Sequence, residues 1–111
     1  MLNTNEMAKA CGFTTANEAE AREVNGVFCG DLLSWAMGRA GEGNAWCTVM
    51  GSVNSVAVSS LADCACIVLC HDAVLSEDAL AKAREQGITV YLTALPEFEA
   101  SVAIGKAIGI I

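Results

Sequence analysis

Basic residues, histidine and proline are scarce in this sequence. Among 111 residues there are six Lys and Arg against 13 Asp and Glu, one His and one Pro, and the formal net charge is −7. The six basic residues do not cluster along the chain. A protein that binds nucleic acid through its phosphates needs a basic face. We therefore expect neither nucleic acid nor an anionic membrane as a partner.

Long apolar runs and an export signal are also absent. No apolar stretch approaches the roughly 20 residues that span a bilayer. Residues 1–6 lack the basic start and the apolar run of a secretory signal peptide. These absences predict a cytoplasmic protein.

Short apolar runs that lead into amphipathic segments are what the sequence does contain. Hydrophobic residues make up 54% of the chain and aromatic residues only 5%. The apolar run 24–29 leads into the amphipathic segment 31–40, the run 46–50 into 54–62, and the run 64–70 into 76–86. A fourth run, 88–93, leads into a helix starting near Pro96. Strands that alternate with helices indicate βαβ units and a parallel sheet.

This alternation predicts a three-layer α/β fold over residues 1–111, as one domain. We expect a mostly parallel sheet of about four strands with helices on both faces. A further helix is expected over residues 2–12, where Asn3 and Glu6 form a capping box and Gly12 ends the helix. The polar residues 14–23 are expected to form a surface connection. The high apolar content and the apolar tail 108–111 suggest a homodimer.

Candidate ligand-binding residues follow the predicted strands. In open parallel sheets, ligands bind beyond the carboxyl ends of the strands. Residues 51–54 carry no acidic side chain, so free N–H groups there can bind a small anionic metabolite or a nucleotide. The candidate residues are Gly30, Asp31, Gly51, Ser52, Asn54, His71 and Asp72.

Simpler roles for the same residues remain open. Asp31 is placed to cap the helix over residues 31–40, and Ser52 and Asn54 also stand at a helix start. His71 and Asp72 fit a surface turn at the end of a strand. In the helix over residues 31–40, one buried face is expected from the spacing of Leu33, Ala36, Met37 and Ala40.

The six cysteines are most simply read as reduced, buried thiols, because no export signal accompanies them. Cys64, Cys66 and Cys70 share one parity of a single apolar run, so we expect them to face one side of the sheet. The Cys-x₂-Cys turn typical of metal sites is missing. Cys29, Cys47 and Cys70 can approach one another across neighbouring strands, which keeps a redox or metal role open.

Two common nucleotide motifs are missing. Residues 105–107, Gly-Lys-Ala, lack the glycine spacing and the Ser or Thr of a P-loop. No Gly-x-Gly-x-x-Gly follows the first predicted strand. No set of catalytic residues is evident, and no cofactor or metal is predicted.

Parts of the chain resemble the stand-alone DRTGG-domain proteins, which are related to the N-terminal domain of HPr kinase-like proteins. The resemblance covers about residues 24–100, and its most specific part is Asp31-Leu32-Leu33-Ser34-Trp35. Related domains occur in pyrophosphatases with CBS modules and in some phosphate acetyltransferases, where they are regulatory or dimerising. The sequence departs from the motif behind the name, with Gly51-Ser52-Val53 for Gly-Asp-Arg and Leu69-Cys70-His71 for Thr-Gly-Gly.

The sequence therefore predicts a non-catalytic regulatory or small-ligand-binding module that acts through oligomerisation or a partner protein. A first alternative is an enzyme, or an accessory subunit of one, that uses Asp31, His71 and thiols. A second alternative is a redox or metal protein built on Cys29, Cys47 and Cys70.

Overall fold

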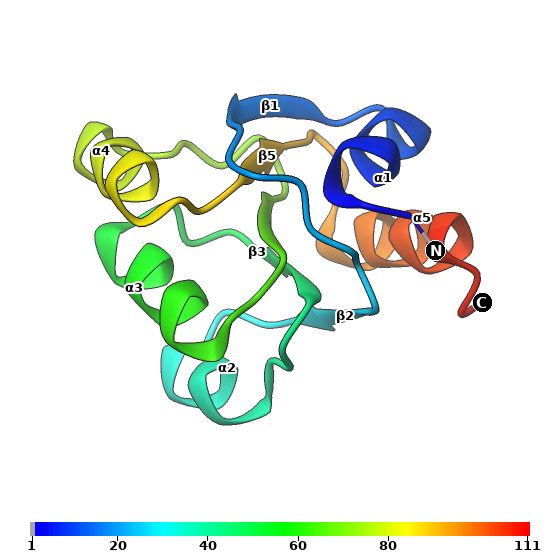
Figure 1. Cartoon of the computed structure of the whole chain (residues 1–111), viewed down its shortest axis with the longest axis horizontal. Coiled ribbons are helices and arrows are strands. Elements are labelled where there is room, and N and C mark those ends of the chain that lie inside the picture. Colours follow the sequence, from blue (N-terminus) through cyan, green and yellow to red (C-terminus); the bar gives the residue numbers. More distant parts are fainter. Residues whose placement is uncertain (1) are drawn as a thin grey trace.

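A computed structural model describes residues 2–111 (Figure 1). Met1, the first residue of the predicted domain, lies outside the described residues. In chain order the elements are α1 (Thr4–Cys11), β1 (Thr14–Asn17), β2 (Gly26–Cys29), α2 (Leu33–Arg39), β3 (Asn44–Thr48), α3 (Val53–Ala62), β4 (Cys66–Leu69), α4 (Glu77–Gln86), β5 (Val90–Leu92) and α5 (Glu97–Ile108). Each of the expected strand–helix pairs is present. The strands β2, β4 and β5 are shorter than the apolar runs suggested, and β3 begins two residues before its predicted run.

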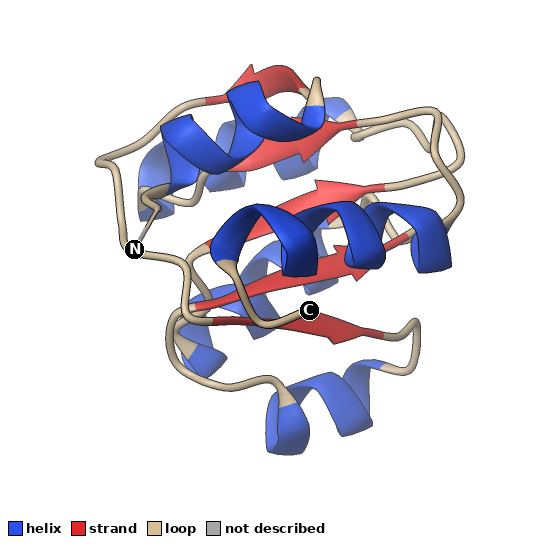
Figure 2. Ribbon diagram, turned by 90° about the vertical axis from the view of Figure 1, so that its right-hand side faces the viewer, coloured by secondary structure: helices blue, strands red, loops and turns tan. Residues whose placement is uncertain are grey.

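The strands form one sheet in the order β1-β5-β4-β3-β2. The strands β2 to β5 are parallel to one another, and β1 pairs antiparallel with β5 at one edge. Helices α1 and α5 cover one face, while α2, α3 and α4 cover the other (Figure 2). The predicted three-layer α/β fold with a mostly parallel sheet is confirmed, with five strands instead of about four.

The additional strand lies in the segment that was expected to be a surface connection. Thr14 and Thr15 of β1 are exposed, so the strand has no apolar alternation that the sequence could reveal. Its pairing comes from residues far along the chain: Thr14 pairs with Leu92, and the Asn17 side chain donates to the Ile88 carbonyl at 2.7 Å. An antiparallel edge strand with one solvated face needs little apolar content.

Two apolar cores lie on the two faces of the sheet. Cys66 and Val68 point toward α1 and α5, whereas Ile67 and Leu69 point toward α2, α3 and α4. This alternation follows from the period of two in a strand. The expectation that Cys64 shares a face with Cys66 and Cys70 is wrong, because Cys64 precedes β4 and packs in the opposite core.

The helix ends agree with the sequence at several points. Asn3 and Glu6 form the expected capping box, and Gly12 ends α1 with φ +74°. The Ser76 hydroxyl accepts from the Ala79 N–H at 3.1 Å and caps α4.

In residues 2–111 no helix has the length and apolar character needed to cross a membrane.

Two expectations about α2 are wrong. The N-cap is Leu32, which makes no side-chain capping bond, and not Asp31. Met37 is 50% exposed, because α2 lies at the end of its layer and packs against α3 on one side only. Helix α2 therefore presents apolar side chains to solvent beside the edge strand β2.

Candidate functional site

The carboxyl ends of the parallel strands β2 to β5 meet at one edge of the sheet (Figure 2). The seven residues selected from the sequence all follow β2, β3 or β4 at this edge. The structure divides them among three places: a pocket beside α2, the start of α3, and a turn after β4.

Asp31 is held by the neighbouring strand β3. Its Oδ1 accepts the Thr48 hydroxyl at 2.7 Å and the Val49 N–H at 2.9 Å. The preceding Gly30 is fixed as well, because its carbonyl accepts the Trp46 Nε1–H at 3.0 Å. Trp46 and Thr48 are both fully buried. The carboxylate that the sequence suggested as a helix cap is thus an anchored group at the end of β2.

Glu97, in the first turn of α5, is a site residue that sequence reasoning missed. Burial raises the pKa of the Glu97 carboxyl, and the hydrogen bond and charge of Asp31 raise it further. Burial also opposes ionisation of Asp31, but hydrogen bonds from Val49, Thr48 and Glu97 and the charge of His71 lower the Asp31 pKa overall. The Asp31 carboxylate thus disfavours ionisation of Glu97.

His71 and Asp72 form a left-handed turn after β4, with φ values of +58° and +57°. Their N–H groups donate to the carbonyls of Leu95 at 2.9 Å and Thr93 at 3.0 Å, which ties the turn to the loop before α5. His71 is close enough to influence the charge of both Asp31 and Glu97. Asp72 instead lines a separate hollow of about 560 Å³ with residues 92–95.

Gly51 lies where two loops touch. A Cβ at this position would overlap the Val74 carbonyl, and the Gly51 carbonyl accepts the Ser76 N–H at 2.9 Å. Ser52 caps α3 without a side-chain capping bond, and both Ser52 and Asn54 are exposed. Gly51 therefore has a packing role between loops, while the Ser52 and Asn54 side chains face solvent at the start of α3.

A pocket of about 380 Å³ lies between the end of β2 and α2. The Arg39 guanidinium carbon lies 4.3 Å from the centre of the Trp35 ring, and 56% of Trp35 is exposed. The lining residues are Phe28, Cys29, Gly30, Asp31, Leu32, Trp35 and Arg39. The pocket thus combines an aromatic surface, a cation and a carboxylate, and it contains most of the block Asp31-Leu32-Leu33-Ser34-Trp35.

Sequence reasoning did not select Trp35 and Arg39. One signal was available: Trp35 lies off the apolar face expected for this helix, and Arg39 follows it by four residues. Residues at this spacing are neighbours on a helix surface. An aromatic residue on the solvent side of a helix, followed by an arginine four residues later, indicates an exposed stacked pair.

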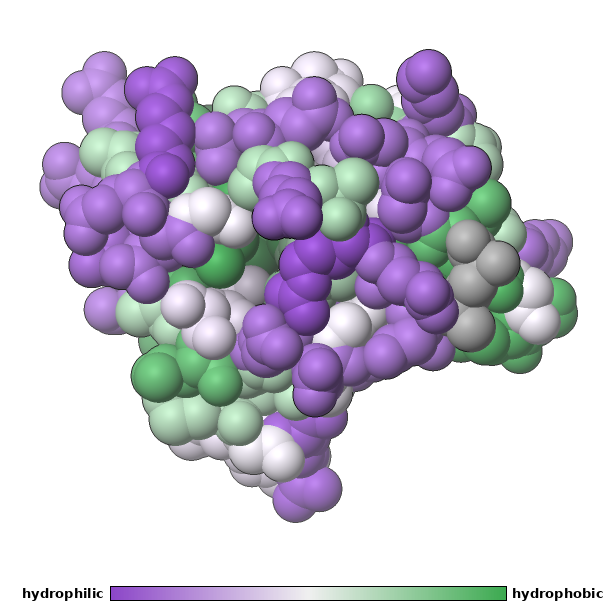
Figure 3. All heavy atoms as spheres, in the orientation of Figure 1, coloured by the Kyte–Doolittle hydropathy of each residue, from purple (hydrophilic) through white to green (hydrophobic). Residues whose placement is uncertain are grey.

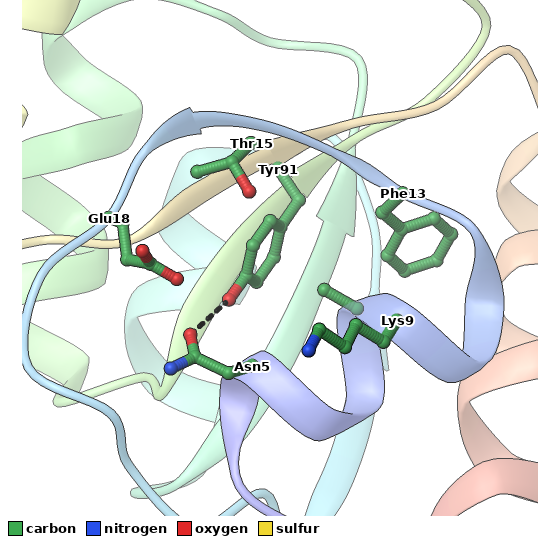
Figure 4. A pocket seen from close by; sticks show the side chains of 7 residues that line it. Asn5, Lys9, Phe13, Thr15, Glu18 and Tyr91 are labelled. Carbon is green, nitrogen blue, oxygen red and sulfur yellow. Dashed lines mark hydrogen bonds between the residues drawn. The ribbon is translucent and has the colours of Figure 1, made fainter.

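A further hollow of about 320 Å³ lies between α1, β1 and β5 (Figure 4). Its floor is Tyr91, whose hydroxyl donates to the Asn5 Oδ1 at 3.4 Å. Lys9 and Glu18 stand at its rim and are both exposed. None of the seven candidate residues lines this hollow, and the polar group at its floor already has a partner within the protein.

The cysteine hypothesis is resolved in part. Cys29, Cys47 and Cys70 do come together across β2, β3 and β4. Within the described chain, however, no group of three or more His, Cys, Asp or Glu side chains is arranged to hold a metal ion. Residues 2–111 therefore provide no set of metal ligands that would support a metal-binding role for these cysteines.

Comparison with known proteins gives a match in structure. No protein-family model matches the chain, and no curated protein matches its sequence. The fold is similar to the crystal structure of the CBS and DRTGG domains of the regulatory region of Clostridium perfringens pyrophosphatase, complexed with the activator diadenosine tetraphosphate. The TM-score is 0.77 at 15% sequence identity, and the match covers 94% of this chain and 46% of that chain. The chain therefore has the DRTGG-like fold that its sequence resemblance implied.

Proposed function

We propose that this chain is a non-catalytic regulatory module that binds a nucleotide in the pocket between β2 and α2. The observation that carries the proposal is the exposed Trp35 ring with the Arg39 guanidinium stacked on it, beside the Asp31 carboxylate. The structural neighbour with the same fold is a regulatory region complexed with a nucleotide activator. The similarity in fold supports a regulatory, nucleotide-binding role. The side chains of the pocket are the ones that would contact the nucleotide.

Each part of a nucleotide has a matching group in this pocket. An aromatic face stacks with a base, and alanine substitution of such a residue typically costs about 1–3 kcal/mol per base. The Arg39 guanidinium can pair with phosphate oxygens in a bidentate manner. Asp31 Oδ1 is occupied by Thr48 and Val49, which leaves the second carboxylate oxygen to accept from a ribose hydroxyl or an exocyclic amine.

The acidic surroundings limit the position of the phosphates. Glu97 stands beside Asp31, so anionic groups bound there would be repelled. We therefore place the phosphates at Arg39, on the side of the pocket away from α5, and the base or ribose toward Asp31. His71 remains available to offset the charge of the two carboxyl groups.

Thermal unfolding with a panel of ligands tests the nucleotide proposal. The probes are adenosine, its mono-, di- and triphosphates, diadenosine tetraphosphate and inorganic phosphate. A nucleotide at ten times its Kd is expected to stabilise the folded protein by about 1.4 kcal/mol, because it binds only the folded state. Quenching of Trp35 fluorescence should accompany the stabilisation.

Trp35→Ala and Arg39→Ala are the informative variants, and Arg84→Ala is the matched control. Arg84 is an exposed arginine in the last turn of α4, outside the pocket. The pocket variants should lose the response to nucleotide, and the control should keep it. The proposal is wrong if no nucleotide stabilises the protein, or if Trp35→Ala responds as the wild type does.

We further propose that the module acts through a second copy of itself. The outer edge of β2 has no neighbouring strand in the described sheet, and unpaired strand edges readily pair with another chain. Exposed apolar side chains lie on α2 beside this edge and at the C-terminus, where Figure 3 shows apolar surface. These side chains are Leu32, Trp35, Met37, Ile110 and Ile111.

Sedimentation at micromolar concentration checks this expectation. A dimer should be present for the wild type, and Met37→Lys should shift the population toward monomer, because a charge at an apolar interface must be desolvated. Leu61→Lys, at a more exposed apolar position on α3, should leave the dimer intact. A wild-type monomer would contradict the proposal without affecting the nucleotide test.

A further inference from the structure

Three cysteines form a row across β2, β3 and β4 at the carboxyl edge of the sheet. Cys29 and Cys47 are register partners on adjacent parallel strands. Cys70 directly follows β4, and its N–H donates to the carbonyl of Thr48, the residue after Cys47, at 2.9 Å. We use the name thiol row for Cys29, Cys47 and Cys70.

Helix α5 covers the thiol row. Cys47 and Cys70 lie in the core on the α5 side of the sheet, together with Ala100 and Ile104 of that helix. The Cys29 thiol donates to the Glu97 carboxylate of α5 at 3.6 Å. Cys29 and Cys47 therefore point to the same side of the sheet.

The three thiols differ in their access to solvent. Cys29 is exposed on the edge strand, whereas Cys47 and Cys70 are fully buried. A small reagent in solution therefore meets Cys29 first, and the second thiol of the row lies directly behind it. An accessible thiol beside a second cysteine is the arrangement found where an oxidised sulfur is resolved as a disulfide.

The backbone spacing is compatible with a disulfide. Neighbouring strands lie about 4.8 Å apart, and disulfides bridge Cα atoms about 4.4–6.8 Å apart. Because Cys29 and Cys47 are register partners on one face, no backbone movement along the strands is needed to join them. We propose that the thiol row is an oxidation site, where a hydroperoxide reacts at Cys29 and a Cys29–Cys47 disulfide forms.

The chemistry proceeds in two balanced steps. The Cys29 thiolate attacks the hydroperoxide, the O–O bond breaks, and a sulfenic acid forms as an alcohol, or water from hydrogen peroxide, leaves. The Cys47 sulfur then attacks Cys29, the S–O bond breaks, and hydroxide leaves and is protonated to water. Two thiols and one hydroperoxide thus give one disulfide, one alcohol and one water.

The proton that Cys47 loses in the second step is the one that converts the departing hydroxide to water, so no further base is needed for the balance. Burial raises the pKa of Cys29, so the first step should accelerate by about tenfold per pH unit until Cys29 is ionised.

Peroxide treatment of the reduced, ligand-free chain tests the proposal. After alkylation and digestion, mass spectrometry should find the peptides of Cys29 and Cys47 joined, and thiol titration should fall from six to four. Cys29→Ser should abolish the cross-link and retain the remaining thiols. Cys11→Ser removes a partly exposed cysteine outside the row, so it should leave the cross-link unchanged.

Three results would overturn the proposal: six thiols that persist in peroxide, a cross-link between chains or to Cys11, or a Cys29→Ser variant that still loses two thiols. Accumulation of sulfinic acid at Cys29 would also overturn it, because the resolving step would then be absent. Cys29→Ser alters an exposed side chain, and circular dichroism of the reduced variant verifies its folding. No nucleotide is present, so the outcome is independent of the ligand proposal.

Discussion

Replacing Trp46 by alanine is expected to lower the free energy of unfolding by about 3–5 kcal/mol, the range for removal of a large buried aromatic side chain. Trp46 is 0% exposed and lies at the centre of β3, in the core beneath α2, α3 and α4. Its Nε1–H also holds the Gly30 carbonyl at 3.0 Å. The substitution therefore removes a core side chain and one support of the candidate pocket.

The second tryptophan of the chain is the matched control. Trp35 is 56% exposed, so Trp35→Ala should change the free energy of unfolding by only about 0.5 kcal/mol. Urea unfolding followed by circular dichroism measures both variants on one scale. Trp46→Phe separates the two contributions, since it keeps much of the apolar volume but leaves the Gly30 carbonyl without its donor. Equal losses for Trp35→Ala and Trp46→Ala would contradict this account.

The order of helices and the parallel strands could be predicted because each leaves a local pattern. Strand β4 is an unbroken apolar run, as expected for a strand covered on both faces, and Ser76 and Gly87 mark the ends of α4. Strand β1 left no such pattern, because its position depends on pairing with β5 more than 70 residues later. Local sequence predicts elements that carry their own burial pattern and misses those that only tertiary pairing creates.

The candidate site shows the same limit. Asp31 stands where a helix cap is expected, but its Oδ1 bonds to Thr48 and Val49, 17 and 18 residues later. Glu97, whose carboxyl group interacts with Asp31, lies 48 residues beyond Val49, so none of these partners of Asp31 is visible in local sequence. The rule that ligands gather at the carboxyl ends of parallel strands directed the search to this edge of the sheet. It did not separate Asp31 and His71, which interact, from Asp72, which faces another hollow.

Asp31 and Glu97 are expected to affect stability in opposite directions as pH changes. The Asp31 pKa is lowered in the folded protein, so its stabilising contribution is present above the unfolded value of about 3.9. That contribution is lost as pH falls through the folded pKa. The Glu97 pKa is raised, so ionisation of Glu97 disfavours the folded state. The cost of Glu97 appears as pH rises from about 4.3 through the folded pKa.

Two variants separate these contributions at neutral and acidic pH. Asp31→Ala leaves the buried Thr48 hydroxyl without its acceptor, and should lower the free energy of unfolding by about 1–2 kcal/mol at neutral pH, since solvent screens the exposed carboxylate. Glu97→Gln should be at least as stable as the wild type at neutral pH. Both differences should shrink as pH falls and the wild-type carboxyl groups become protonated.

Urea unfolding at a series of pH values gives the free energy of unfolding of each variant as a function of pH. Glu99→Gln is the control, because it removes one negative charge from the same helical turn. Glu97→Gln also removes the carboxylate that accepts the Cys29 thiol. In this variant the Cys29 thiolate should form at lower pH and react faster with peroxide, because a neighbouring negative charge is gone. A Glu97→Gln protein that is less stable than the wild type at neutral pH would show that Glu97 supports the edge of the sheet, and that the paired carboxyl groups carry no cost.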